Sequence, residues 1–186
     1  YYDSASWRGT WQTEGGGALM TQGIHTVDLL QWIMGPVCSV SARMGTLVHR
    51  IEVEDTVVAA LEYASGALGV IEATTASRPG TPARLEFTGS RGTIAIEADR
   101  IVTWEVEGEP APMAAAAAGS DVAKAAADSR TFGTEGHKAQ IEEMVRVVAT
   151  GGHPEIDGLE GRRTLELVLA IYQSARAGTA VDLPLS

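Results

Sequence analysis

The stretch GGGALMTQGIHTVD, residues 15–28, is the most informative part of this chain for its fold. Three glycines permit a tight turn, and the apolar residues after them recur every three or four positions, which predicts an amphipathic α-helix over residues 18–34. Gly35 and Pro36 are expected to end it. The apolar side would then pack against a core through Leu19, Met20, Ile24, Val27, Leu30 and Met34.

A second side of the same predicted helix is polar. Thr21, His25 and Asp28 are three or four residues apart, so we expect them to face one side of the helix, where they could line one cavity. His25 is a candidate for proton transfer, because imidazole has an unperturbed pKa of about 6.5. The alternative is a structural histidine, and spacing alone does not separate the two.

The glycine run does not match a dinucleotide-binding fingerprint. Its glycines are not spaced as G-x-G-x-x-G, and no strand-like segment precedes them. A tight turn, or a close approach to another segment, explains them equally well. We therefore expect that any nucleotide is bound outside this chain.

The composition predicts one soluble, cytoplasmic domain over residues 1–186. Twenty-four acidic and fourteen basic residues give a net charge of -10, which disfavours nucleic acid and anionic membranes as partners. No targeting sequence is present, and no apolar run approaches the roughly 20 residues that span a bilayer. The single cysteine, Cys38, cannot form an internal disulfide, and no cluster has metal-ligand spacing, so no metal is expected. Because the chain begins at Tyr1, we expect it to derive from something longer.

The middle of the chain changes to a strand-like pattern. Six segments rich in valine, isoleucine, threonine and aromatic residues predict strands, and their short connections favour antiparallel hairpins. Helices are expected at 135–150 and 161–177, beside the first helix. The predicted class is α+β, with an open, mostly antiparallel sheet of about six strands and helices on one face. The alanine-rich residues 107–130 are expected to be a mobile insertion. The strand segments are 39–48, 55–63, 68–75, 83–88, 93–97 and 101–106.

Five separated motifs resemble, in order along the chain, the C-terminal domain of the Gfo/Idh/MocA oxidoreductases. The resemblance implies an enzyme that transfers hydride between NAD or NADP and a sugar, inositol or related polyol, with the cofactor bound mainly by an N-terminal Rossmann domain. It also implies a fold like the C-terminal domain of glyceraldehyde-3-phosphate dehydrogenase, and a homodimer or homotetramer formed through the open sheet face. The motifs are Trp7 to Trp11, Gly15 to Asp28, Glu54-Asp55-Thr56, Gly133 to His137, and Leu165 to Arg176.

The resemblance also assigns residues to a site. It implies that His25 is catalytic, together with a lysine of a Glu-Lys-Pro motif in the other domain. Neither of the two lysines, Lys124 and Lys138, stands in such a motif, so the chain alone is expected to be inactive. Thr21 stands where inositol dehydrogenase-like members carry an aspartate, and threonine can hydrogen-bond but cannot supply that charge. Asp28 is the candidate substitute.

Two further residues are candidates for substrate binding. Arg8 and His137 could hold a polar or anionic group of the substrate, because a guanidinium pairs well with carboxylate or phosphate. Arg8 is equally well explained as a surface residue between two tryptophans, and His137 as a structural residue near a helix start. The competing function is a non-catalytic module for substrate binding and oligomerisation. A full-length product with G-x-G-x-x-G and Glu-Lys-Pro motifs would favour the dehydrogenase.

Overall fold

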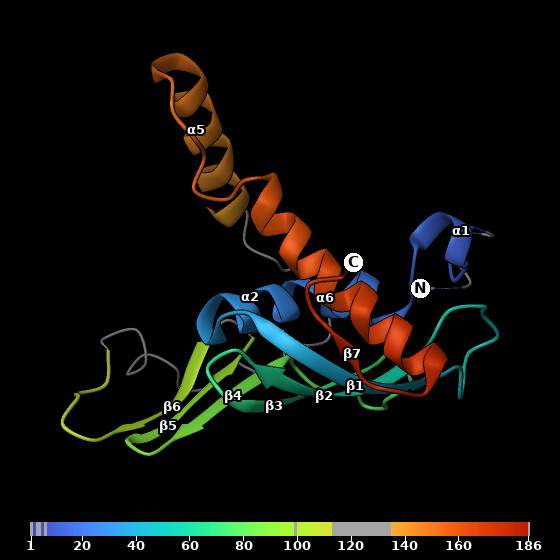
Figure 1. Cartoon of the computed structure of the whole chain (residues 1–186). Helices are drawn as coiled ribbons and strands as arrows, with labels where there is room; N and C mark the ends of the chain where they lie inside the picture. Colours follow the sequence, from blue (N-terminus) through green and yellow to red (C-terminus); the bar gives the residue numbers. More distant parts are fainter. Residues whose placement is uncertain (1, 3–4, 6, 99, 113–134, 186) are drawn as a thin grey trace. The chain divides into compact units, whose positions relative to one another are not determined.

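The computed structural model describes residues 2, 5, 7–98, 100–112 and 135–185 (Figure 1). The chain forms two compact units, one made of Tyr1–Ser77 with Glu155–Ser186 and the other of Arg78–Pro154. Helices and antiparallel strands make up both, so the α+β class is confirmed. Most of the predicted insertion at 107–130 lies outside the described residues, which end at 112 and resume at 135.

The first unit is built on a four-stranded antiparallel sheet in the order β3-β2-β1-β7. Residues along β2 alternate between buried and exposed, as expected for a sheet with one covered face. Its inward side chains, Val57, Ala59, Leu61 and Tyr63, are all at most 2% exposed. The strands are β1 (Val37–Gly45), β2 (Thr56–Tyr63), β3 (Leu68–Thr74) and β7 (Val181–Asp182), the last of which the sequence pattern did not predict.

Helices α2 (Ile24–Met34) and α6 (Gly158–Ala177) pack on the inner face of this sheet, and Figure 1 shows both on the same side of the strands. The core between them contains Val27 of α2 and Leu167 and Ile171 of α6. Helix α6 begins three residues before its predicted start, because the Asp157 side chain accepts hydrogen bonds from the amides of Leu159 and Glu160 and caps it.

The helix predicted over residues 18–34 is not one continuous α-helix. A short helix, α1 (Trp11–Glu14), comes first, and the π-helical turn η2 (Leu19–Gly23) then leads into α2. A π turn contains an extra residue, so it changes which side chains share a face. The α-helical spacing predicted for residues 18–34 therefore applies only from Ile24 onward. None of the helices in the described part of the chain is long and apolar enough to cross a membrane.

The second unit contains a three-stranded antiparallel sheet in the order β4-β5-β6 and the helix α5 (Glu135–Thr150). All six predicted strands occur, but hydrogen bonding divides them between two sheets, so the single six-stranded sheet was wrong. The segment between β3 and β4 contains Pro79 and Pro82, which have no amide hydrogen to donate and interrupt a ladder. The strands are β4 (Arg84–Gly89), β5 (Gly92–Glu97) and β6 (Arg100–Val106).

Asp55 organises the long connection between β1 and β2. Its fully buried carboxylate accepts hydrogen bonds from the amides of Leu47, Val48 and His49 at 2.8–2.9 Å. Burial by itself would raise the pKa of Asp55, but these three bonds and one from the Thr56 hydroxyl outweigh it and lower the pKa to about 2. The ionised carboxylate therefore stabilises the connection.

This lowered pKa predicts how acid affects stability. Ionised Asp55 contributes its full stabilisation above the ordinary aspartate pKa of about 4, and the contribution, about 2 kcal/mol, is lost as the pH falls towards about 2. Asp55→Asn should therefore lower the Tm clearly at pH 7, and the gap from the wild type should narrow below pH 4. Thermal unfolding from pH 7 to pH 2 measures both, with Glu62→Gln, an exposed carboxylate on β2, as control. A gap that is constant with pH would contradict this role.

Candidate functional site

A buried carboxylate holds the start of the helix that carries His25. Glu54 is 2% exposed, and its Oε2 accepts a hydrogen bond from the Gly17 amide at 2.8 Å, while its Oε1 accepts one from the Leu19 amide at 3.0 Å. The amide between them, that of Ala18, donates to the main-chain oxygen of Glu54 at 3.0 Å. Three consecutive amides at the start of the helical segment are thus satisfied by one residue.

The glycines are required by this close approach. A Cβ atom added to Gly17 would lie 1.8 Å from the main-chain oxygen of Glu54, and one added to Gly16 would lie 2.2 Å from the Tyr172 hydroxyl. Of the two explanations that the sequence left open for this glycine run, close contact with another segment is the one observed at these positions. The amides of Gly17, Ala18 and Leu19 are occupied by Glu54, so they do not form a cradle for the phosphates of a dinucleotide.

Tyr172 of α6 completes the surroundings of Glu54. Its hydroxyl donates to Glu54 Oε1 at 2.8 Å. Burial, followed by the adjacent carboxylate, raises the pKa of Tyr172 far above its ordinary value, so the phenol keeps its proton and remains a donor. The Trp11 ring packs edge-on against Tyr172 at 5.2 Å, and the Arg176 guanidinium lies 4.3 Å from the Trp11 ring centre. The first helical segments and α6 are therefore joined by one polar and aromatic cluster.

Thr21 lies within the π turn. Its amide and its hydroxyl both donate to the main-chain oxygen of Gly17, at 2.9 and 2.8 Å. The hydroxyl proton is thus directed to the helix backbone, while the hydroxyl oxygen keeps lone pairs that can accept a hydrogen bond. Thr21 can serve a bound substrate as an acceptor without leaving this position.

His25 lies in the first turn of α2 with an exposed side chain. The imidazole makes no hydrogen bond to another residue in the described part of the chain. Asp28, one turn further along, instead accepts a hydrogen bond from the Thr164 hydroxyl of α6. No hydrogen bond joins any two of Thr21, His25 and Asp28 within the described residues. His25 is thus accessible to a substrate, whereas Asp28 connects two helices.

The other two predicted residues lie elsewhere. Arg8 is half-buried in the turn before α1, with its guanidinium 4.8 Å from the Trp7 ring centre. It is in the same unit as His25. His137 lies on α5 in the second unit, and its side chain is exposed.

Sequence reasoning did not assign a role to Glu54 or Tyr172. The signal that could have found Glu54 is an acidic pair, Glu54-Asp55, placed between Val53 and Val57 at the start of a buried strand. Charges in such a position need partners, because an unpaired buried carboxylate is costly. The hydrogen-bond partners of Glu54 could not be predicted from the sequence, because Gly17 and Tyr172 are far from Glu54 along the chain.

Comparisons with known proteins give one consistent result. The sequence profile of the GFO/IDH/MocA C-terminal domain matches residues 1–95. D-apiose dehydrogenase from Paraburkholderia graminis is 29% identical over 165 residues, which are 87% of this chain and 43% of that protein.

Two solved structures are similar over the whole chain. The WlbA dehydrogenase from Bordetella pertussis, in complex with NADH and UDP-GlcNAcA, is 37% identical with a TM-score of 0.81, and the match covers 100% of this chain and 50% of that one. The WlbA dehydrogenase from Chromobacterium violaceum, with the same two ligands, is 38% identical with a TM-score of 0.81, covering 100% and 51%. The chain thus spans about half the length of the relatives it matches.

The packing of Gly17 against Glu54 can be tested by substitution. Gly17→Ala should lower the free energy of unfolding by about 3 kcal/mol, because the new methyl group would overlap the Glu54 main-chain oxygen and separate the two segments. Gly161→Ala is the matched control, since Gly161 lies in α6 with open space around it and should gain up to about 1 kcal/mol. Denaturant unfolding measures both. Equal stabilities of Gly17→Ala and wild type would refute the close contact.

Proposed function

The chain belongs to the GFO/IDH/MocA C-terminal domain family, and we propose that it is the substrate-binding and oligomerisation part of an NAD(P)-dependent oxidoreductase acting on a sugar or related polyol, inositol included. The observation that carries the proposal is the exposed His25 at the start of α2, on a helix whose beginning is fixed by buried hydrogen bonds. Relatives with sugar dehydrogenase names and NADH-bound structures support it.

His25 is proposed to act as the general base that accepts the proton of the substrate hydroxyl. A nicotinamide cofactor bound outside this chain would supply the hydride acceptor, and a nitrogen of the His25 imidazole would take the proton of the substrate hydroxyl. Proton transfer by a positioned side chain contributes on the order of 10²–10⁴ in rate. The accessible imidazole suits this role, because no hydrogen bond to another described residue occupies its nitrogens.

Nicotinamide binding is assigned mainly to a region outside this chain. The amides that could have formed a phosphate cradle at residues 17–19 are used by Glu54, so the described residues do not fit the pyrophosphate of NAD or NADP there. We place the cofactor in an N-terminal Rossmann domain, together with the Glu-Lys-Pro lysine. On this view the 186-residue chain alone is inactive.

The candidate substrate-binding residues differ in the hydrogen bond or charge that each side chain can offer a substrate. Thr21 can accept a hydrogen bond from a substrate hydroxyl, and Arg8 can contribute positive charge towards an anionic group. Asp28 is a weaker candidate, because Thr164 already donates to its Oδ1. His137 is kept as a candidate from the second unit. Because the WlbA structures contain UDP-GlcNAcA, a sugar nucleotide with a carboxylate should be assayed beside free sugars.

The alternative function, a non-catalytic binding and oligomerisation module, is favoured by one observation. Thr21 cannot supply the negative charge that an aspartate would place beside the imidazole. If substrate binds to the full-length product without any change in nicotinamide absorbance, the module is the better description. Turnover of any sugar by that product would exclude it.

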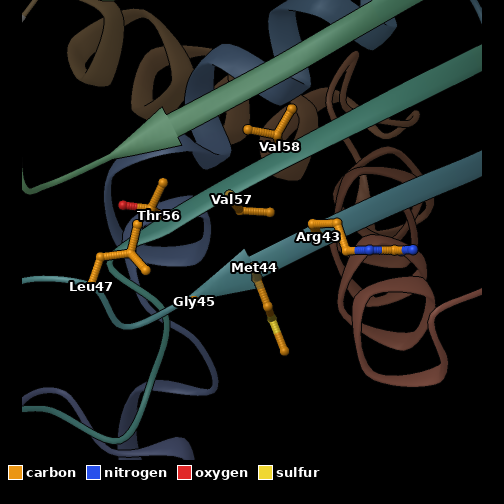
Figure 2. A pocket seen from close by; sticks show the side chains of 7 residues that line it. All are labelled: Arg43, Met44, Gly45, Leu47, Thr56, Val57 and Val58. Carbon is orange, nitrogen blue, oxygen red and sulfur yellow. The ribbon is translucent and has the colours of Figure 1, made fainter.

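The outer face of the four-stranded sheet is proposed to bind a second copy of the chain. Val58, Leu68 and Val70 of β2 and β3 are 44%, 79% and 70% exposed, so an apolar surface faces solvent. A shallow hollow of about 240 Å³ lies at the end of β1 and the start of β2 (Figure 2). Pairing of two such faces would bury these side chains and give a homodimer or, by repetition, a homotetramer. The hollow is lined by Arg43, Met44, Gly45, Leu47, Thr56, Val57 and Val58.

The role of His25 has a direct test. His25→Asn in the full-length gene product should reduce kcat on the order of 10²–10⁴, because proton transfer at the substrate hydroxyl is lost. Steady-state rates of nicotinamide reduction with D-apiose, D-xylose and UDP-GlcNAcA measure it. The control is His153→Asn, since His153 is exposed and lies outside both helices that carry candidate site residues. Unchanged turnover of His25→Asn would refute the role.

The proposed interface also has a test. Val70→Lys should convert the oligomer to a smaller species, because a charge among the exposed apolar side chains of this face opposes its burial. Sedimentation velocity gives the mass of each species. Leu159→Lys, which places the same charge at an exposed position of α6, should leave the mass unchanged. Retention of the oligomer by Val70→Lys would place the interface elsewhere.

A further inference from the structure

We propose that Glu54 is a positioning residue that sets the orientation of His25. The inference rests on the proposed function of His25 in proton transfer. It concerns a residue that does not itself reach the reacting atoms, because its side chain is 2% exposed and its contacts are all within the fold. Two of its hydrogen-bond partners, the amides of Gly17 and Leu19, lie at the start of the short helical segment that leads to His25.

A chain of hydrogen bonds connects Glu54 to the helical segment that carries His25. The Glu54 carboxylate fixes the amides of Gly17 and Leu19, and the Gly17 carbonyl in turn accepts from both the amide and the hydroxyl of Thr21. The π turn over Leu19–Gly23 then runs directly into α2, with His25 as its second residue. A shift or rotation at Leu19 is therefore transmitted to His25 along a hydrogen-bonded helix.

Glu54 is itself held in place through its neighbour in the chain. Its neighbour Asp55 donates its amide to Gly45 of β1 at 3.1 Å and accepts at its carbonyl from Thr75, just after β3, at 2.9 Å. The Asp55 carboxylate adds three further bonds to residues 47–49. Glu54 is thus anchored to the sheet, so the carboxylate provides a rigid reference for the helix rather than following it.

The hydrogen bonds at position 54 require a carboxylate. Three donors converge on its two oxygens: the amides of Gly17 and Leu19 and the hydroxyl of Tyr172. A glutamine has the same shape but only one acceptor oxygen, and its NH₂ group would face at least one of these donors. The helix start must then move away from the unmatched pair, since a buried donor facing a donor is unfavourable.

The π turn explains why this anchoring matters. π-helical turns are rare and often occur at functional sites, because their extra residue alters the direction of nearby side chains. Here the turn lies between the Glu54 contacts and His25, so the direction of the imidazole depends on where the turn begins. Glu54 fixes that beginning at Leu19.

The primary experiment compares Glu54→Gln with Glu52→Gln in the full-length gene product. Glu52 is exposed and only two residues away from Glu54, so Glu52→Gln makes the same chemical change at a position that lacks the buried contacts. We expect Glu54→Gln to lower kcat by roughly 10- to 100-fold with KM changed less than about twofold, since misplacement of a catalytic group affects the transition state more than substrate binding. Glu52→Gln should match the wild type in both constants.

A double variant tests whether Glu54 acts through His25. If it does, Glu54→Gln should add no further loss of kcat to His25→Asn, because the group that Glu54 positions is already absent. A further multiplicative loss in the double variant would show a separate role and overturn the inference. So would a wild-type kcat for Glu54→Gln.

Two outcomes separate this inference from the proposed function. If His25→Asn keeps full turnover, the proton-transfer role fails and the positioning role fails with it. If His25→Asn loses turnover while Glu54→Gln does not, only the positioning role fails. Should Glu54→Gln not fold, Tyr172→Phe decides, because it removes one donor and leaves the ring in place. We expect its kcat to fall with an unchanged KM, and an unchanged kcat would overturn the inference.

Discussion

The first unit depends on one constraint, the burial of the Glu54 carboxylate against the start of a helix. A carboxylate removed from water is stable only when donors replace the lost hydration, and here two amides and a phenol do so. The same contacts satisfy the amides that a helix start leaves without intrahelical partners. The carboxylate thus gains donors and the amides of the helix start gain an acceptor. Three segments far apart in the sequence, around Gly17, Glu54 and Tyr172, are joined at this contact.

Several other features follow from that contact. Gly16 and Gly17 leave room for Tyr172 and for the Glu54 backbone, so the glycine run serves packing. Asp55 immediately afterwards holds residues 47–49, so two adjacent acidic residues fix two different segments, the helix start and the connection between β1 and β2. The Trp11 ring and the Arg176 guanidinium extend the cluster outward from Tyr172. These side chains pack together at the start of the helical segment, whereas the His25 side chain on α2 is exposed to solvent.

Different residues hold the helix in place and carry the proposed proton transfer. Glu54 and Tyr172, which hold the start of the helical segment, are buried and hydrogen-bonded, whereas the imidazole proposed to react is exposed and makes no hydrogen bond to another described residue. Precise placement of a catalytic side chain generally requires such a supporting layer, because small displacements cost rate. Asp28 belongs to the support through Thr164, although its spacing from His25 first indicated a role in the site. The comparisons place the chain in its family, and the contacts around Glu54 supply a physical reason why its glycine-rich motif and its acidic motif occur together.

The sequence by itself determined the α+β class, the six strands, three of the helices and His25 as the candidate for proton transfer. Alternating and helical periodicities are local properties, so they can be read from neighbouring residues. Only the tertiary structure decided that the strands form two sheets, that a π turn precedes α2, and that Gly17 and Tyr172 both meet Glu54. Glu54 lies 37 residues from Gly17 and 118 from Tyr172. No local pattern specifies which distant donor a buried carboxylate will find, because that choice is made by the packing of the whole unit.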